Sequence, residues 1–110
     1  MEQLFSYGTL RDEKVQRSVF GRTVAGRSDA IVGCRLEPVT ITAGESIAIS
    51  GTADHTILVK TGNDADEISG VLFEITEQDL ARADAYEDAA YVRVRVRLRS
   101  GTDAWVYAKA

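Results

Sequence analysis

Near its start the chain reads Leu4-Phe5-Ser6-Tyr7-Gly8-Thr9-Leu10, which predicts a strand over Leu4–Tyr7 that ends in a glycine turn. A glycine after a strand lets the backbone approach a ligand closely, and neighbouring N–H groups can form an anion-binding nest. Such a turn can hold a carboxylate, although most turns of this kind simply join a strand to a helix. Walker and dinucleotide-binding loops are excluded here, because their glycine spacing and lysine are missing.

A second stretch, far along the chain, reads Ala85-Tyr86-Glu87-Asp88-Ala89-Ala90-Tyr91-Val92-Arg93. It places the carboxylate of Glu87 where a predicted helix over Glu77–Glu87 meets a predicted strand over Tyr91–Arg99. Most glutamates at helix ends are solvated, but a partly buried carboxylate can serve as a general base. Arg93 is close enough in sequence to orient Glu87 or to pair with another acid.

Capping signals define the two predicted helices. Asp12 is a suitable N-cap and Gly21 a suitable C-terminal residue for a helix over Glu13–Phe20. Thr76 and Asp79 approximate a capping box at the start of the later helix, with aspartate in place of the usual glutamate or glutamine.

The remaining elements are short strands. Tyr91–Arg99 alternates apolar and polar residues, and a polar turn predicts that it forms a hairpin with Ala104–Lys109. Pro38 marks a strand start or a break, and Thr42–Ala53 is predicted to be mostly loop. The other predicted strands are Thr23–Arg27, Ala30–Leu36, Val39–Ile41, His55–Lys60 and Ser69–Ile75. Many short strands with two helices indicate an α+β fold, with a curled or barrel-like sheet and helices packed on it.

The composition narrows the class of protein. The chain has 110 residues, 45% of them hydrophobic and 27% charged, which favours one globular domain over residues 1–110. The formal net charge of −4 argues against a nucleic-acid-binding face or a polybasic membrane patch. The single Cys34 excludes an internal disulfide, and neither a signal peptide nor a membrane span is recognisable. We therefore expect a cytoplasmic protein; the oligomeric state is not indicated.

Several other side chains could carry chemistry. Cys34 and His55 could form a nucleophilic pair, but Cys34 lies in an apolar predicted strand, where an inert core thiol is the usual case. One cysteine and one histidine do not make a zinc site without two more ligands, so neither residue is assigned a role. Possible pocket-lining residues are Ser6, Thr9, Trp105 and Tyr107.

Taken together, the two stretches resemble a known family. Phe-x-Tyr-Gly-Thr-Leu at Phe5–Leu10 and Tyr-Glu-Asp-x-x-Tyr-x-Arg at Tyr86–Arg93 resemble the gamma-glutamylcyclotransferase-like superfamily. Within it, the chain is similar to the avirulence-induced-gene-like group and to gamma-glutamylamine cyclotransferase. The similarity runs over nearly the whole chain and includes Gly33–Leu36 and Ala104–Tyr107.

The resemblance implies a small mixed β-barrel with flanking short helices and a cavity for a γ-glutamyl group. It implies that Tyr7, Gly8, Thr9 and Leu10 bind the substrate, that Tyr91 lines the pocket and that Glu87 is the acid/base residue. The implied reaction is intramolecular: the α-amine of a γ-glutamyl amine or amino acid attacks its own γ-carbonyl. The products would be 5-oxoproline and the released amine, and no metal or cofactor would be required.

Two other functions remain open from the sequence. The same pocket could belong to a non-catalytic module that binds a small acidic molecule, which would show saturable binding without a product. A purely structural role predicts that no pocket lies between Tyr7 and Glu87.

Overall fold

The computed structural model describes residues 1–40, 44–51, 54–87 and 90–109. Its centre is a five-stranded sheet in the order β2-β5-β1-β7-β6. The central strand β1 pairs antiparallel with β5 and parallel with β7, so the sheet is mixed. The outer strands β2 and β6 pair antiparallel with β5 and β7, respectively. The five strands are β1 (Glu2–Ser6), β2 (Gly26–Val32), β5 (Glu67–Ile75), β6 (Tyr91–Arg97) and β7 (Asp103–Lys109).

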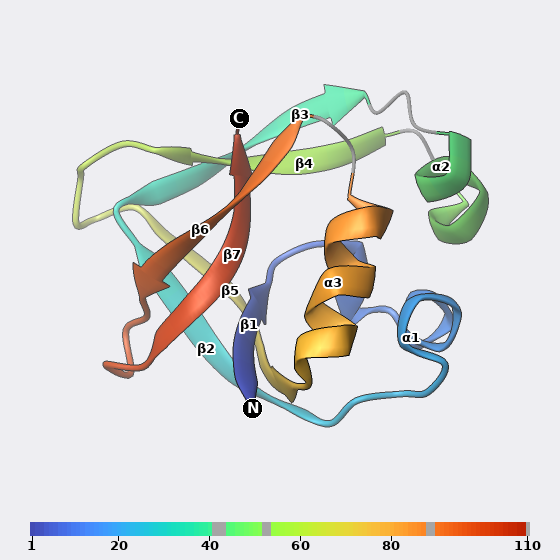
Figure 1. Cartoon of the computed structure of the whole chain (residues 1–110). Coiled ribbons are helices and arrows are strands. Elements are labelled where there is room, and N and C mark those ends of the chain that lie inside the picture. The colour runs from blue at the N-terminus through green and yellow to red at the C-terminus, as the bar shows by residue number, and fades with distance from the viewer. Residues whose placement is uncertain (41–43, 52–53, 88–89, 110) are drawn as a thin grey trace.

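A second sheet contains two antiparallel strands, β3 (Cys34–Thr40) and β4 (Asp54–Lys60). β4 packs against β7 and β3 against β5, so the two sheets curl around a shared interior (Figure 1). The α+β class with a curled sheet is confirmed. Among the described residues, the ladders form two separate sheets and no single closed ring.

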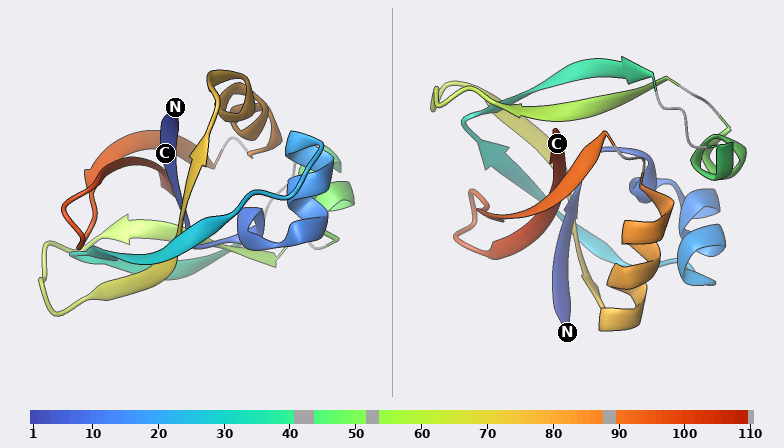
Figure 2. Two further views of the ribbon diagram at one scale, coloured as in Figure 1. Left: turned by 90° about the horizontal axis from the view of Figure 1, so that it is seen from below. Right: turned by 45° about the horizontal axis from the view of Figure 1, so that its top comes forward.

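Three α-helices occur in the described part of the chain: α1 (Glu13–Phe20), α2 (Gly44–Ser50) and α3 (Glu77–Tyr86). A short 3₁₀ helix, η1 (Thr9–Arg11), precedes α1. α1 and α3 pack side by side, as Figures 1 and 2 show. Within the described ranges, no helix is long and apolar enough to cross a bilayer.

The helix caps agree with the sequence. The Asp12 side chain accepts a hydrogen bond from the N–H of Lys14, and Gly21 ends α1 with φ 75°. At the start of α3, Thr76 and Asp79 form both hydrogen bonds of a capping box. α3 ends at Tyr86, one residue before the predicted end, so Glu87 is the residue that leaves the helix.

Three predictions for the middle of the chain were wrong. The predicted strand Ala30–Leu36 is two strands, because Gly33 adopts φ 79° and breaks the extended backbone. Pro38 lies inside β3, which β4 pairs on one side only, so the missing N–H is tolerated as on an edge strand. Part of the predicted loop Thr42–Ala53 is α2; residues 41–43 and 52–53 lie outside the described residues.

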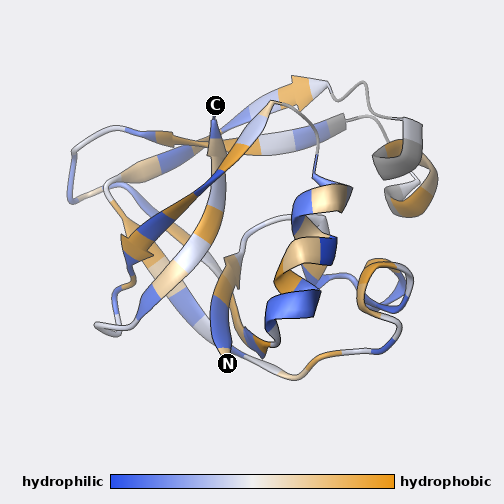
Figure 3. Ribbon diagram, in the orientation of Figure 1, coloured by the Kyte–Doolittle hydropathy of each residue, from blue (hydrophilic) through white to orange (hydrophobic). Residues whose placement is uncertain are grey.

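The core has two parts, one on each face of β1. Leu4 packs into a cluster with apolar residues of α1 and α3, whereas Phe5 packs into a cluster that includes Leu58 of β4. This alternation follows from the two-residue period of a strand. On β6 the predicted alternation is visible in Figure 3, and Val92 on its apolar side is 44% exposed.

Candidate active site

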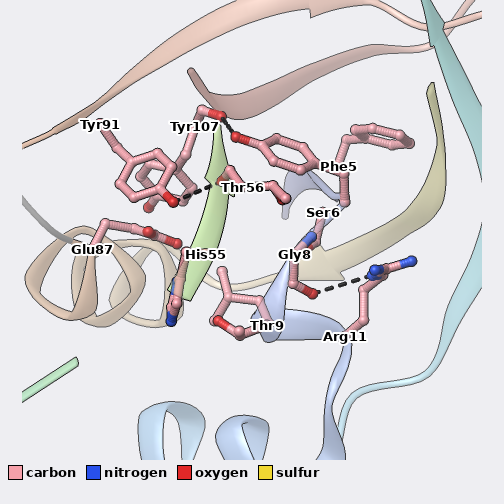
Figure 4. A pocket seen from close by; sticks show the side chains of 12 residues that line it. Phe5, Ser6, Gly8, Thr9, Arg11, His55, Thr56, Glu87, Tyr91 and Tyr107 are labelled. Carbon is pink, nitrogen blue, oxygen red and sulfur yellow. Dashed lines mark hydrogen bonds between the residues drawn. The ribbon is translucent and has the colours of Figure 1, made fainter. Parts of the chain in front are cut away.

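A pocket of about 450 Å³ opens where the turn after β1 meets β4, the end of α3 and strands β6 and β7. Figure 4 shows its lining side chains converging from these separate elements. All six residues that the resemblance assigned to the site line this pocket. The lining residues are Phe5, Ser6, Tyr7, Gly8, Thr9, Leu10, Arg11, His55, Thr56, Glu87, Tyr91 and Tyr107.

The turn after β1 is held by its own polar groups. The Gly8 carbonyl accepts hydrogen bonds from the Arg11 backbone N–H at 3.2 Å and from Arg11 Nε at 3.1 Å. The Gly8 N–H donates to Ser6 Oγ at 3.3 Å. Gly8 has φ −123°, so no left-handed backbone demands glycine, and a Cβ there would meet no atom within 4 Å. The glycine therefore leaves space open beside the turn.

Behind this turn, buried Gln16 of α1 fixes the 3₁₀ helix. Its side-chain amide donates to the Leu10 carbonyl at 2.9 Å and accepts from the Val24 N–H at 2.9 Å. Thr9 Oγ1 lies 2.6 Å from the hydroxyl of Tyr86, the last residue of α3. These contacts tie the turn to both helices.

Tyr7 is a bridge between the two sheets. Its hydroxyl donates to the Tyr107 carbonyl on β7 at 2.5 Å and accepts from the Leu58 N–H on β4 at 3.0 Å. The side chain is 7% exposed, and burial raises the pKa of the phenol. Because the hydroxyl proton is used inside the protein, Tyr7 offers the pocket its ring and its backbone.

Glu87 leaves α3 with an extended backbone, and its N–H donates to the Ala83 carbonyl at 3.1 Å. Its side chain is half-buried. Figure 4 shows its carboxylate extending into the pocket, across from Gly8 and close to His55. The geometry therefore brings one carboxylate to the same cavity as the turn of Tyr7–Leu10.

Tyr91 of β6 and Tyr107 of β7 form another wall of the pocket. The Tyr91 hydroxyl donates to the Thr56 carbonyl at 2.7 Å, which joins β6 to β4. The Tyr107 hydroxyl donates to Asp84 Oδ1 at 2.7 Å. Arg93 binds both Asp84 oxygens, at 2.8 and 3.1 Å, which fits the prediction that it pairs with another acid.

Some candidates from the sequence lie elsewhere. Cys34 is 3% exposed in the core, and burial raises the pKa of its thiol, as expected for an inert cysteine. Trp105 does not line the pocket; its ring lies under the guanidinium groups of Arg93 and Arg95. Among the described residues, no group of three or more His, Cys, Asp or Glu side chains could hold a metal ion.

Sequence reasoning gave no pocket role to Phe5, Arg11, His55 and Thr56, all of which line the cavity. For His55 and Thr56, no local motif marks the position, because β4 reaches the site only through long-range packing against β7. Arg11 directly follows the Tyr7–Leu10 stretch, so extending that stretch by one residue would have included it.

The sequence matches the family described as "Gamma-glutamyl cyclotransferase, AIG2-like" over residues 4–110. No curated protein matches it. Among solved structures, one titled "Gamma-glutamyl cyclotransferase" is 16% identical, with a TM-score of 0.74 over 99% of this chain and 66% of that chain. A protein from Arabidopsis thaliana is 16% identical, with a TM-score of 0.69 over 98% of this chain and 61% of that chain.

A third similar structure is an uncharacterized protein from Pyrococcus horikoshii. It is 18% identical, with a TM-score of 0.66 over 99% of this chain and 78% of that chain. At these identities the likeness shows the fold. The chain spans less than two thirds of the length of the first two structures.

Proposed function

The chain belongs to the gamma-glutamyl cyclotransferase, AIG2-like family, and from that premise we propose that it cyclises a γ-glutamyl amine or amino acid to 5-oxoproline. The observation that carries the proposal is the shared pocket, in which the Glu87 carboxylate lies across from the Tyr7–Leu10 turn. Family membership favours this enzymatic function over a module that only binds a small molecule.

In the proposed complex, the turn binds the γ-glutamyl group. The backbone N–H groups of Thr9 and Leu10 donate to no other described residue, so they support binding of the substrate carboxylate. The rings of Tyr7 and Tyr91 flank the methylene groups of the substrate. Binding in this way folds the glutamyl chain back on itself, and positioning then supplies much of the rate because nucleophile and carbonyl share one molecule.

Glu87 supplies the proton transfers. Its carboxylate takes a proton from the α-ammonium group, and the freed amine attacks the γ-carbonyl carbon to form the new C–N bond. The tetrahedral intermediate collapses as the bond to the leaving nitrogen breaks. Glu87 returns its proton to that nitrogen, and the ring nitrogen gives its second proton to the released amine, so that 5-oxoproline and an ammonium ion leave and the carboxylate is restored. The whole sequence needs one side-chain acid/base.

The experiment is a product search by mass spectrometry. The purified protein is incubated with γ-glutamyl amines, γ-glutamyl amino acids and glutathione, alongside Glu87→Gln and the control Glu77→Gln. The Glu77 side chain is exposed and lies in the first turn of the same helix, so the control removes a similar charge away from the pocket. We expect 5-oxoproline from wild type and Glu77→Gln, but not from Glu87→Gln. Saturable binding without any product would support the binding module instead.

A cytoplasmic location and a small-molecule γ-glutamyl partner are part of this proposal. They follow from the composition and the family. A substrate released inside the cell would reach the pocket directly, because the pocket opens to solvent beside the exposed Arg11 and Thr56 side chains.

A further inference from the structure

We infer that Asp84 is a positioning residue, which fixes Glu87 relative to the Tyr7–Leu10 turn by joining the last turn of α3 to strands β6 and β7. This inference rests on the proposed function of the pocket. It concerns a carboxylate that is not among the residues lining the pocket.

Asp84 is the centre of a hydrogen-bond network. Its Oδ1 accepts from Arg93 Nε at 2.8 Å and from the Tyr107 hydroxyl at 2.7 Å, and its Oδ2 accepts from an Arg93 terminal nitrogen at 3.1 Å. The Trp105 ring lies 4.3 Å from the Arg93 guanidinium and restrains it by a cation–π contact. The carboxylate is therefore held from β6 and from β7 at once.

Tyr107 connects this hydrogen-bond network to the pocket. Its hydroxyl is bound by Asp84 and its carbonyl by the Tyr7 hydroxyl, while the residue itself lines the cavity. The side chain is 7% exposed. Tyr107 is therefore held at its side-chain hydroxyl by Asp84 and at its backbone carbonyl by Tyr7, and the position of this pocket wall depends on both contacts.

Asp84 also fixes the position of the last turn of α3, from which Glu87 extends. Asp84 lies in the last turn of α3, and Glu87, three positions later, is the first residue after the helix. The Glu87 N–H is bound to the carbonyl of Ala83, which is fully buried. A shift of the last turn of α3 would therefore carry Glu87 with it, and a displacement of about 1 Å can reduce the rate about a hundredfold.

Strand β6 offers a matched control. Arg97 pairs with Asp103 at 3.1 Å, but the two side chains are 74% and 53% exposed, and neither lines the pocket. Both arginines lie on the same side of the strand, because they are separated by an even number of residues. Of these two ion pairs, the one between Arg93 and Asp84 is linked to the cavity, through the hydrogen bond from Tyr107 to Asp84.

The test compares Asp84→Asn, Tyr107→Phe and Arg97→Gln with wild type. We expect the first two variants to lower kcat by about tenfold to a hundredfold with little change in KM, because the turn that binds the substrate is intact. Arg97→Gln should leave both constants unchanged. Equal kcat for Asp84→Asn and wild type would overturn the inference, as would a rise in KM alone.

A second readout does not depend on turnover. In NMR spectra of the same proteins, the carboxyl carbon of Glu87 and the ring of Tyr107 should shift in Asp84→Asn and stay in place in Arg97→Gln. Unmoved resonances in Asp84→Asn would contradict the positioning role. If wild type forms no 5-oxoproline from any substrate, the proposed function fails, and the NMR result still decides the role of Asp84.

Discussion

The two ends of helix α3 each carry an aspartate bound by an arginine, and the two pairs differ in burial and in their further contacts. At the first turn, Asp79 has a side chain only 2% exposed. It accepts from Arg22 at 2.9 and 2.6 Å and completes the capping box with Thr76. At the last turn, the Asp84 side chain is 40% exposed and its contacts lead through Tyr107 to the pocket.

This difference indicates that the two aspartate–arginine pairs have different roles. A buried carboxylate that satisfies a helix start contributes mainly to folding, because its loss removes the helix cap and the partner of a charged side chain. A more exposed ion pair contributes little to stability, so its value lies in the geometry that it fixes. The Asp79 contacts at the start of α3 thus mainly stabilise the fold, and the Asp84 contacts at its end mainly fix the position of Glu87.

The largest change in stability is expected from Asp79→Ala. The substitution removes both hydrogen bonds from Arg22 and the capping box with Thr76, so unfolding should become easier by about 2–3 kcal/mol. Denaturant unfolding measures this change. The kcat of the remaining folded protein should equal that of wild type; a large loss of kcat would break the distinction between the two ends.

The same carboxylate predicts a pH dependence. The Arg22 guanidinium holds the pKa of Asp79 well below its usual range, although burial opposes this shift. In the unfolded chain the pKa is about 3.9, so the stabilisation is complete above that value and is lost as the pH falls toward the folded pKa. The stability difference between wild type and Asp79→Ala should therefore narrow by about 2 kcal/mol between pH 4 and pH 2. A constant difference over this range would contradict the assignment.

On the sheet side of the pocket, Tyr7→Phe should have a smaller effect. It removes the hydroxyl that joins Leu58 and Tyr107 and leaves a buried N–H and a buried carbonyl without that partner. We expect a loss of about 1–2 kcal/mol in the free energy of unfolding, measured by thermal and denaturant unfolding. An unchanged stability would show that the bridge between β4 and β7 is not needed to form the pocket walls.

The smallest effect is expected on the exposed part of β6. Arg97→Gln should change the free energy of unfolding by less than about 0.5 kcal/mol. Arg93→Gln should be similarly mild in unfolding, because the Arg93 side chain is itself partly exposed, yet it should lower kcat. If both variants reduce kcat equally, the network of Asp84 has no special link to the site.

The elements that the sequence predicted best are the helices whose ends are marked by capping residues. Asp12 and Gly21 bound α1, and Thr76 and Asp79 begin α3, because caps are local chemistry. The break at Gly33 was not predicted, since a glycine with positive φ looks the same in sequence as one inside a buried strand. Helix α2 was missed because Gly44–Ser50 has no clear cap and few apolar residues at helical spacing.

For the site, the resemblance brought together Tyr7–Leu10, Glu87 and Tyr91, and the structure places all of them around one pocket. The sequence did not predict that His55, on β4 of the second sheet, lines the pocket. It also did not predict the hydrogen bond that joins Tyr107 of β7 to Asp84 of α3. Such contacts depend on the packing of distant strands, which no local pattern encodes.

The most direct test is the single-turnover rate of 5-oxoproline formation by wild type and Glu87→Gln, measured with the best γ-glutamyl substrate. Thermal unfolding of both proteins establishes that the variant is folded. We predict that Glu87→Gln lowers the rate by about a hundredfold to ten-thousandfold, the range of a lost general acid/base. A rate equal to that of wild type in the folded variant would contradict the central claim that Glu87 moves the proton.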